Sequence, residues 1–365
     1  MSVRLEDGLT IVDCFGGGRE RGLAHGESAR RLIHEGIARW QEATLAGQPR
    51  GTAMRDYAAR FVGGTGLMAA MEGTVPDLVE EIRGIADGAA LPYEIVAAYN
   101  LMDEQWWYDL DTPPQAEPGC SLVALSDTRR TVLGQNMDLP GFMDGSQIVL
   151  RLREPGRPET LVLSSAGLIG LTGVSRAGFG ICVNTLLMLN HSSAGLPVAA
   201  VFRHALAQDS AAGAIAALKS LRHASGQHYA VADRHEVTGV ECSAGGCSVS
   251  SPAGRSILTH TNHPLASGDV DAASLAILER RGRVDNSRRR LAFLDGRVGG
   301  LAGADDVIAL LADPSTPICV TAEPARPSHT FGSVVFEMAE ETTAYFCLAH
   351  PTKADWQAVS WSDDR

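Results

Sequence analysis

The sequence lacks the features that mark several common classes of protein. It contains no Lys or Arg run long enough to follow a phosphate backbone, and 43 acidic against 31 basic residues give a formal net charge of -12. The first residues, Met-Ser-Val-Arg-Leu-Glu-Asp, hold no apolar signal-peptide core. Residues 177–202 carry no charged side chain of the Asp, Glu, Lys or Arg type, but Asn, His, Ser and Pro interrupt them. We therefore expect neither a nucleic-acid partner nor a membrane segment.

The commonest hydrolase signatures are also missing. The sequence has no Gly-x-Ser-x-Gly elbow, no His-Glu-x-x-His pair and no tight Cys-x-x-Cys knuckle. One set of residues could still hold zinc: Cys242, Cys247, His260 and His263. The two glycines between these cysteines favour a turn with incidental thiols. We expect no metal and no cofactor, and keep a zinc hydrolase as an alternative.

Cysteine usage points to a reducing compartment. The seven cysteines are an odd number, spread over positions 14, 120, 182, 242, 247, 319 and 347 with no visible secretory leader. This distribution predicts reduced thiols rather than a disulfide framework. We expect a cytoplasmic location.

The length of 365 residues, with 45% hydrophobic and 20% charged residues, is ample for a large core. The first 110 or so residues have helical patterns, at 23–45, 76–90 and 93–110. The rest alternates short β-like runs with helical stretches at 197–221, 272–294 and 305–312. The β-like runs cover residues 121–126, 131–138, 147–152, 160–165, 179–184, 228–233, 238–242, 256–261, 333–337 and 343–348. Strand groups separated by helix pairs predict an α+β layered sandwich.

Cys120 stands at the boundary between these two halves. Residues 111–119 contain three prolines and end in Pro-Gly, which is typical of an exposed linker. If the Gly119–Cys120 bond is cut, the freed α-amine of Cys120, with an ordinary pKa near 8, can act as a base for its own thiol. Gly119 would let the backbone approach during that cleavage. The alternative is a buried strand cysteine without chemistry.

Several further stretches carry a resemblance to a known family. These are Gly-Cys-Ser-Leu-Val-Ala-Leu at 119–125, Gly-Gln-Asn-Met-Asp at 134–138, the glycine-rich run 167–186, and His-Thr-Asn-His at 260–263. The N-terminal half adds residues 19–26 and 81–89. Together and in this order they resemble the acyl-coenzyme A:isopenicillin N acyltransferase family of self-cleaving N-terminal-nucleophile (Ntn) hydrolases, distantly related to penicillin V acylase and bile salt hydrolase.

The resemblance implies a four-layer αββα Ntn-hydrolase sandwich that cuts itself between Gly119 and Cys120. A small chain, residues 1–119, would stay docked on a catalytic chain, residues 120–365, as an αβ heterodimer. Cys120 would be the nucleophile. Asp138, eighteen residues later on the next predicted strand, would hydrogen-bond the new amine and the nucleophile.

The resemblance also implies a set of binding groups. The side-chain amide of Asn262 would complete an oxyanion hole, and Asn184 lies where relatives supply a backbone donor. Arg326 stands at about the separation of a functional arginine near the C-terminus. Trp106, in the aromatic run 106–108, is either core packing or a wall of the acyl pocket.

We therefore expect an amidohydrolase or acyltransferase that acts on a small N-acyl amine or N-acyl amino acid through a thioester acyl-enzyme. The partner would be a small-molecule amide or acyl donor. Besides the zinc hydrolase, two alternatives remain open: an acyl-coenzyme A-dependent N-acyltransferase of the penicillin-biosynthesis type, and an uncleaved binding protein that keeps only the fold.

Overall fold

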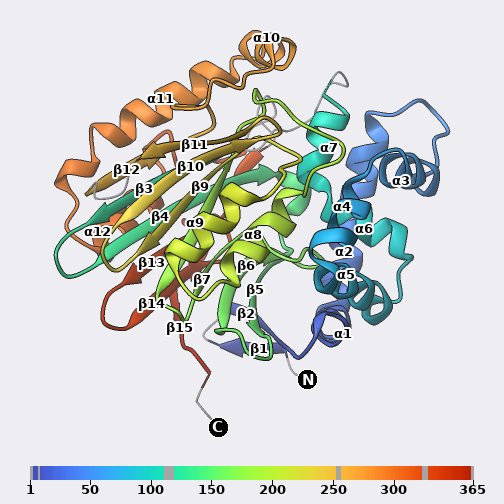
Figure 1. The fold of residues 1–365 in the computed structure, drawn as a ribbon, viewed down its shortest axis with the longest axis horizontal. Coiled ribbons are helices and arrows are strands. Elements are labelled where there is room, and N and C mark those ends of the chain that lie inside the picture. Colours follow the sequence, from blue (N-terminus) through green and yellow to red (C-terminus); the bar gives the residue numbers. More distant parts are fainter. Residues whose placement is uncertain (1–2, 7–8, 111–118, 252–255, 323–327, 363–365) are drawn as a thin grey trace.

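Two stacked β-sheets form the centre of the molecule, and helices cover both outer faces (Figure 1). The structure is a computed structural model that describes residues 3–6, 9–110, 119–251, 256–322 and 328–362. Its layers run helix, sheet, sheet, helix, so the predicted four-layer αββα sandwich is confirmed. No helix among these residues is long and apolar enough to cross a bilayer.

The larger sheet has nine strands, in the order β1-β2-β5-β6-β7-β8-β9-β10-β11. Neighbouring strands are antiparallel except β2 and β5, which are parallel. The strands are β1 Val3–Glu6, β2 Leu9–Phe15, β5 Gln147–Arg153, β6 Thr160–Ser165, β7 Thr172–Ser175, β8 Phe179–Thr185, β9 Gln227–Asp233, β10 Val237–Ser243 and β11 Gly246–Ser251. Because β2 pairs with β5, the N-terminal part of the chain contributes a strand to the larger sheet.

The smaller sheet has six antiparallel strands, in the order β12-β3-β4-β13-β14-β15. They are β12 Ile257–His260, β3 Gly119–Ser126, β4 Thr131–Pro140, β13 Ser328–Met338, β14 Thr342–Cys347 and β15 Gln357–Val359. The predicted nucleophile is the second residue of β3. It therefore lies inside this sheet and not on a sheet edge.

Successive side chains of each strand point to opposite faces of its sheet, so each strand contributes to two different apolar layers. Leu122 and Ala124 point into the core between the two sheets, whereas Val123 packs outward against the helix residue Leu294. Ile181 and Val183 likewise face the helices on the far side of the larger sheet. An apolar core thus lies between each pair of adjacent layers among the described residues.

The helices divide unequally between the two outer faces. The larger group packs over the nine-stranded sheet: α1 Gly18–Ser28, α2 Arg30–Ala46, α3 Met54–Gly63, α4 Leu67–Thr74, α5 Pro76–Ala89, α6 Tyr93–Asn100, α7 Met102–Tyr108, α8 Val198–Leu206 and α9 Ala211–Ser220. The second group lies on the side of the six-stranded sheet: α10 Ala272–Arg280, α11 Arg283–Asp295 and α12 Ala304–Ala312. Short 3₁₀ turns cover Gly141–Met143 and Val298–Gly300.

Helices α1 and α5 cross at very short range, which explains two of the family-like motifs. A Cβ atom on Gly22 would lie 1.9 Å from the carbonyl oxygen of Glu81, and one on Gly88 would lie 2.6 Å from that of Leu23. No side chain fits at either position, so glycine is required by backbone contact.

A buried ion triad ties this helical region to the rest of the chain. Glu81 on α5 accepts hydrogen bonds from Arg21 Nε at 2.9 Å and from Arg203 Nη1 at 2.7 Å. All three side chains are almost fully buried. Arg203 lies on α8, so the triad would bridge the two fragments if the chain were cut before Cys120.

The predicted element types are mostly confirmed, with three kinds of error. The N-terminal region is not purely helical, because Leu9–Phe15 alternates buried and less buried residues and forms β2. Strands β1, β7, β11 and β15 and helices α3 and α4 were not among the predicted runs. The long helical patterns 23–45, 93–110, 197–221 and 272–294 are each broken into two helices. At the last break Gly282 has φ +68°, a left-handed conformation that ends α10 before α11 begins.

Candidate active site

Cys120 lies beside the strand that carries Asp138, as expected. The antiparallel register of β3 and β4 pairs Gly119 with Asp138 and Cys120 with Met137. Cys120 is only 2% exposed. A Cβ atom on Gly119 would lie 3.2 Å from Asp138 Oδ2, so the carboxylate packs directly against the backbone before the thiol. The strand pairing thus places an acid next to the predicted cleavage bond.

Asn262 connects the backbone of Cys120 to β8. Its Oδ1 accepts hydrogen bonds from Cys120 N at 2.8 Å and from Arg290 Nη2 at 2.8 Å, and its Nδ2 donates to the carbonyl oxygen of Thr185 at 3.1 Å. A peptide N–H and a guanidinium can only donate, and a carbonyl can only accept. These partners therefore fix which end of the Asn262 amide faces Cys120.

Arg290 on α11 is the residue that sequence reasoning missed. Its Nη1 donates to the carbonyl oxygen of Cys120 at 2.5 Å and to Ser121 Oγ at 3.0 Å, while Nε donates to Asn286 Oδ1 at 2.9 Å. Arg290 as a whole is 2% exposed. In the sequence it is the last of three consecutive arginines, and nothing there separates it from the exposed Arg288.

Electrostatics keep the Cys120 thiol protonated in the uncut chain. Burial raises the pKa of Cys120 well above its ordinary value, and the negative charge of Asp138 raises it further, against a smaller opposing effect of Arg290. Asp138 is itself held by Thr330, whose Oγ1 donates to Oδ1 at 2.8 Å. A thiol in this setting needs a nearby base before it can act as a nucleophile.

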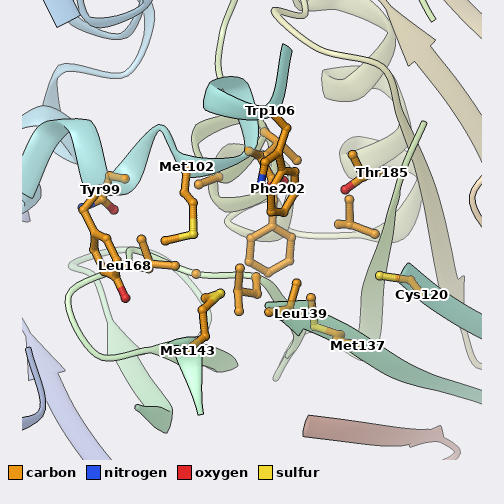
Figure 2. Close-up of a pocket in the computed structure, with 17 residues that line it drawn as sticks. Tyr99, Met102, Trp106, Cys120, Met137, Leu139, Met143, Leu168, Thr185 and Phe202 are labelled. Atoms are coloured by element: carbon orange, nitrogen blue, oxygen red, sulfur yellow. The ribbon is translucent and has the colours of Figure 1, made fainter. Parts of the chain in front are cut away.

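An apolar cavity opens on the thiol side of Cys120 (Figure 2). Figure 2 shows Trp106, Met102 and Phe202 around this space, with Thr185 facing Cys120. Most of its walls are aliphatic, aromatic or methionine side chains. Trp106 is therefore a wall of this cavity, which favours the pocket interpretation over simple core packing.

A polar cavity lies on the other side of the same residue. Gly119, Asp138 and Asn262 contribute to its wall, together with Arg283 and Arg290 from α11. Thr185 borders both cavities. The bond between Gly119 and Cys120 thus lies between an apolar cavity and a polar one that contains both an acid and two arginines.

Comparison with known proteins assigns the family. Residues 125–353 match the family described as acyl-coenzyme A:6-aminopenicillanic acid acyl-transferase. The chain belongs to this family. It is also 29% identical over 283 residues to the acyl-coenzyme A:6-aminopenicillanic-acid-acyltransferase 40 kDa form of Emericella nidulans, an alignment that covers 75% of this chain and 76% of that protein. This confirms the resemblance drawn from the sequence motifs.

Solved structures give weaker similarities to this acyltransferase-family chain. The Caenorhabditis elegans ortholog of N-acylethanolamine-hydrolyzing acid amidase is 17% identical, with a TM-score of 0.40 over 59% of this chain and 92% of that one. Penicillin V acylase from Agrobacterium tumefaciens is 14% identical, with a TM-score of 0.41 over 66% of this chain and 86% of that one. The family match identifies the protein as an enzyme of the Ntn acyltransferase and amidohydrolase group.

Of the other predicted site residues, Asn184 is described by the structure and Arg326 is not. The side chain of Asn184 turns away from the cavities: its Oδ1 lies 3.2 Å from His228 Nδ1, while its neighbours Val183 and Thr185 line the apolar cavity. The sequence analysis assigned to Asn184 a backbone N–H in the oxyanion hole, and that role stays a prediction.

The zinc alternative is wrong for the residue set that the sequence indicated. Cys242 and Cys247 face each other across β10 and β11 and form a disulfide, so the expectation that every thiol is reduced is also wrong. The histidine beside them is His223, whose Nε2 lies 3.6 Å from Cys247 Sγ. His260 is elsewhere: its Nε2 lies 3.0 Å from Glu241 Oε1. Within the described ranges, the side chains close enough to share a metal ion are His223, Cys242 and Cys247, and not the predicted four. The antiparallel pairing of β10 and β11 brings these two cysteines together, and the spacing of the cysteines in the sequence does not predict this pairing.

Proposed function

We propose that this enzyme is a self-processing cysteine amidohydrolase or acyltransferase that uses Cys120 as its N-terminal nucleophile. The supporting observation is the setting of Cys120 N, which Asn262 holds at 2.8 Å at the junction of two cavities. Asp138 packs against the preceding residue. This is the surrounding that a newly formed α-amine would need.

Self-cleavage would come first. Cys120 Sγ attacks the carbonyl carbon of Gly119, the Gly119–Cys120 amide bond breaks, and the nitrogen leaves as the free α-amine. Water then hydrolyses the resulting thioester and releases the Gly119 carboxylate. The products are residues 1–119 and 120–365, which the Arg21–Glu81–Arg203 triad and the β2–β5 pairing would keep together as an αβ heterodimer.

Turnover would reuse the same atoms. The α-amine accepts the thiol proton, Sγ attacks the substrate carbonyl, and the proton passes to the departing amine. The acyl group remains on Cys120 as a thioester until water or an acceptor amine takes it. Asn262 Nδ2 carries two hydrogens, of which Thr185 accepts one, and the second suits the developing oxyanion together with the backbone N–H of Asn184.

The two cavities support an N-acyl amino acid or a similar N-acyl amine as substrate. The apolar cavity, which the Cys120 thiol borders, would take the acyl group. The polar cavity would take the amine portion, where the guanidinium groups of Arg283 and Arg290 favour a carboxylate.

The test combines intact mass with a substrate panel. We expect wild-type protein to give two fragments that separate only on denaturation, and to release amine from N-acyl amines. Cys120→Ala should give one uncut chain without activity, and Cys120→Ser should cleave and turn over slowly if at all. Cys347→Ala, which removes a different buried thiol, is the matched control.

Two results would contradict this proposal. An uncut wild-type chain that stays intact on incubation would favour the uncleaved binding protein. Consumption of an acyl-coenzyme A with every N-acyl amine left intact would favour the acyl-coenzyme A-dependent transferase. Because both are read from the same samples, the experiment separates the alternatives directly.

A further inference from the structure

Four buried polar side chains interrupt the apolar layer between the two sheets. In the register of the larger sheet, Asn184 on β8 pairs with His228 on β9, and His228 pairs with Glu241 on β10. The ring of His228 stacks on that of His260 from β12, with centroids 3.6 Å apart and planes 4° from parallel. All four residues are fully buried. Polar groups at such a place are costly unless they satisfy one another.

The carboxylate of Glu241 is surrounded by donors. Its Oε1 accepts from Leu265 N at 2.6 Å, and its Oε2 accepts from Ala266 N at 2.9 Å and from Ser267 N at 2.6 Å. His260 Nε2 lies 3.0 Å from Oε1. Burial raises the pKa of Glu241, but the hydrogen bonds from His260 and from the three peptide N–H groups outweigh it and hold this pKa below its ordinary value. Glu241 is therefore an ionised carboxylate.

The two contacts of His260 fix its charge. Nε2 faces the Glu241 carboxylate, and Nδ1 lies 2.8 Å from the carbonyl oxygen of Thr261. An ionised carboxylate and a peptide carbonyl can only accept hydrogen bonds, so both ring nitrogens of His260 carry hydrogen. His260 is thus an imidazolium, and it forms a buried ion pair with Glu241.

The stacked ring of His228 is neutral. Its Nδ1 donates to Asn184 Oδ1 at 3.2 Å, and its Nε2 has no hydrogen-bond partner among the described residues. Burial, and then the charge of His260, lower the pKa of His228 well below its ordinary value. A neutral aromatic ring lying flat on a cationic one stabilises the cation. His228 therefore supports the charged form of His260.

The ion pair holds the segment that carries Asn262 on both sides of that residue. His260 donates to the carbonyl oxygen of the Thr261–Asn262 peptide, and the N–H of the same peptide donates to Ser287 Oγ at 2.7 Å. Glu241 binds the backbone again at residues 265–267. Between these points the side chain of Asn262 accepts from Cys120 N at 2.8 Å. The direction of that side chain thus depends on a backbone that the pair fixes.

We propose that Glu241 and the imidazolium of His260 are positioning residues that hold the Asn262 amide against Cys120. This inference rests on the proposed function, because it takes Asn262 as the donor to the oxyanion. Replacing a buried ion pair as a whole costs little stability, whereas removing one partner leaves an uncompensated charge. The two effects allow a role in geometry to be separated from a role in folding.

The first test reads the protonation states in the unaltered protein. Neutron diffraction from wild-type crystals exchanged into heavy water should show deuterium on both ring nitrogens of His260, on Nδ1 alone of His228, and on neither oxygen of Glu241. Deuterium on only one nitrogen of His260, or on the Glu241 carboxyl, would overturn the inference. This measurement needs no variant to fold.

The second test compares single and double variants. Glu241→Gln should lower the melting temperature, and the double variant Glu241→Gln, His260→Gln should recover it, because no charge is left uncompensated. We expect kcat to fall by about 100-fold in both, with KM changed by less than about threefold, as for a displacement of about 1 Å. A purely structural role predicts instead that kcat recovers together with the melting temperature. His235→Gln, in the exposed turn between β9 and β10, is the control.

Crystal structures of the same variants keep this inference separate from the proposed function. The hydrogen bond between Cys120 N and Asn262 Oδ1 should be lost in the double variant and kept in His235→Gln. If wild type turns over no amide but this loss is seen, the proposed function fails and the positioning of Asn262 stands. If wild type is active and the double variant keeps both the hydrogen bond and wild-type kcat, the inference is wrong and the proposed function stands.

Discussion

Arg290 Nη1 donates a hydrogen bond to the carbonyl oxygen of Cys120 at 2.5 Å, although 170 residues separate the two in the chain. The same guanidinium donates to Asn262 Oδ1 at 2.8 Å. One buried cation thereby fixes the backbone of the proposed nucleophile and the amide beside it. Under the proposed function, this arrangement would make Arg290 a positioning residue for both self-cleavage and turnover.

Replacing Arg290 should therefore slow both reactions. Lysine cannot reproduce a planar donor that reaches two acceptors, so Arg290→Lys should lower the rate of fragment formation and kcat by about 100-fold, with a smaller change in KM. Intact mass against time and initial rates measure the two effects. Arg288→Lys, on the exposed face of α11, is the control. Normal rates in Arg290→Lys would show that the contact is not needed.

Removing the charge of Asp138 should block processing while leaving the fold in place. Asp138→Asn keeps the shape and can still accept from Thr330, but it has no charge to stabilise the ammonium that develops at Cys120 N as the Gly119–Cys120 bond breaks. We expect an uncut chain with near wild-type melting temperature. Thr330→Val should give a milder defect, since the carboxylate loses one orienting hydrogen bond. Asp127→Asn, at an exposed turn, should behave like wild type, and full cleavage in Asp138→Asn would be inconsistent with the assigned role.

Breaking the ion triad should destabilise the protein and release the N-terminal fragment. Glu81→Gln removes the carboxylate that both buried arginines share. Arg21 then keeps Asp77, and both arginines keep Glu154 at 3.5 Å, so we expect a loss of about 3 kcal/mol, the lower end for a broken buried pair. Denaturant unfolding measures the loss, and gel filtration after cleavage reports whether the fragments separate. Glu80→Gln, on the exposed side of the same helix, should change stability by less than about 0.5 kcal/mol.

Stability should fall in mild acid because of His25. Its Nε2 accepts a hydrogen bond from Gly167 N at 3.0 Å, and burial lowers the pKa of His25 from 6.5 to about 4. The unfolded chain therefore binds more protons than the folded one between these values, so stability is present above pH 6.5 and is lost as the pH falls to 4, by about 3 kcal/mol. His25→Gln keeps an acceptor and does not titrate. Comparing the pH dependence of unfolding in the two proteins isolates this residue, and identical slopes would refute the assignment.

Enlarging the apolar cavity should shift the preferred acyl group. Trp106→Ala removes an aromatic wall beside Phe202, and we expect longer or bulkier acyl groups to gain relative to short ones by about 10-fold in kcat/KM (Figure 2). Trp356→Ala, in the separate core under α12, tests for a general loss of packing. An unchanged order of acyl preference would place the acyl group elsewhere.

The sequence by itself determined the types of most elements, the family, and the adjacency of Cys120 and Asp138. These features depend on the spacing of apolar residues, on the proline-rich linker before Cys120 and on two strands joined by a short turn. Each of them is contained in a short stretch of sequence. The glycine motifs near Gly22 and Gly88 were visible too, but their reason, a backbone contact between α1 and α5, was not.

Only the tertiary structure decided the remaining parts of the site. It selected Arg290 from three consecutive arginines, because α11 presents one of them to β3. The tertiary structure also joined Cys242 to Cys247 and placed both apart from His260. The reason is that the register of the β10–β11 hairpin, and not the spacing of the cysteines in the sequence, decides which sulfur atoms meet. Long-range packing determines which of several equivalent side chains meets a given atom, and this information is not local to any stretch of sequence.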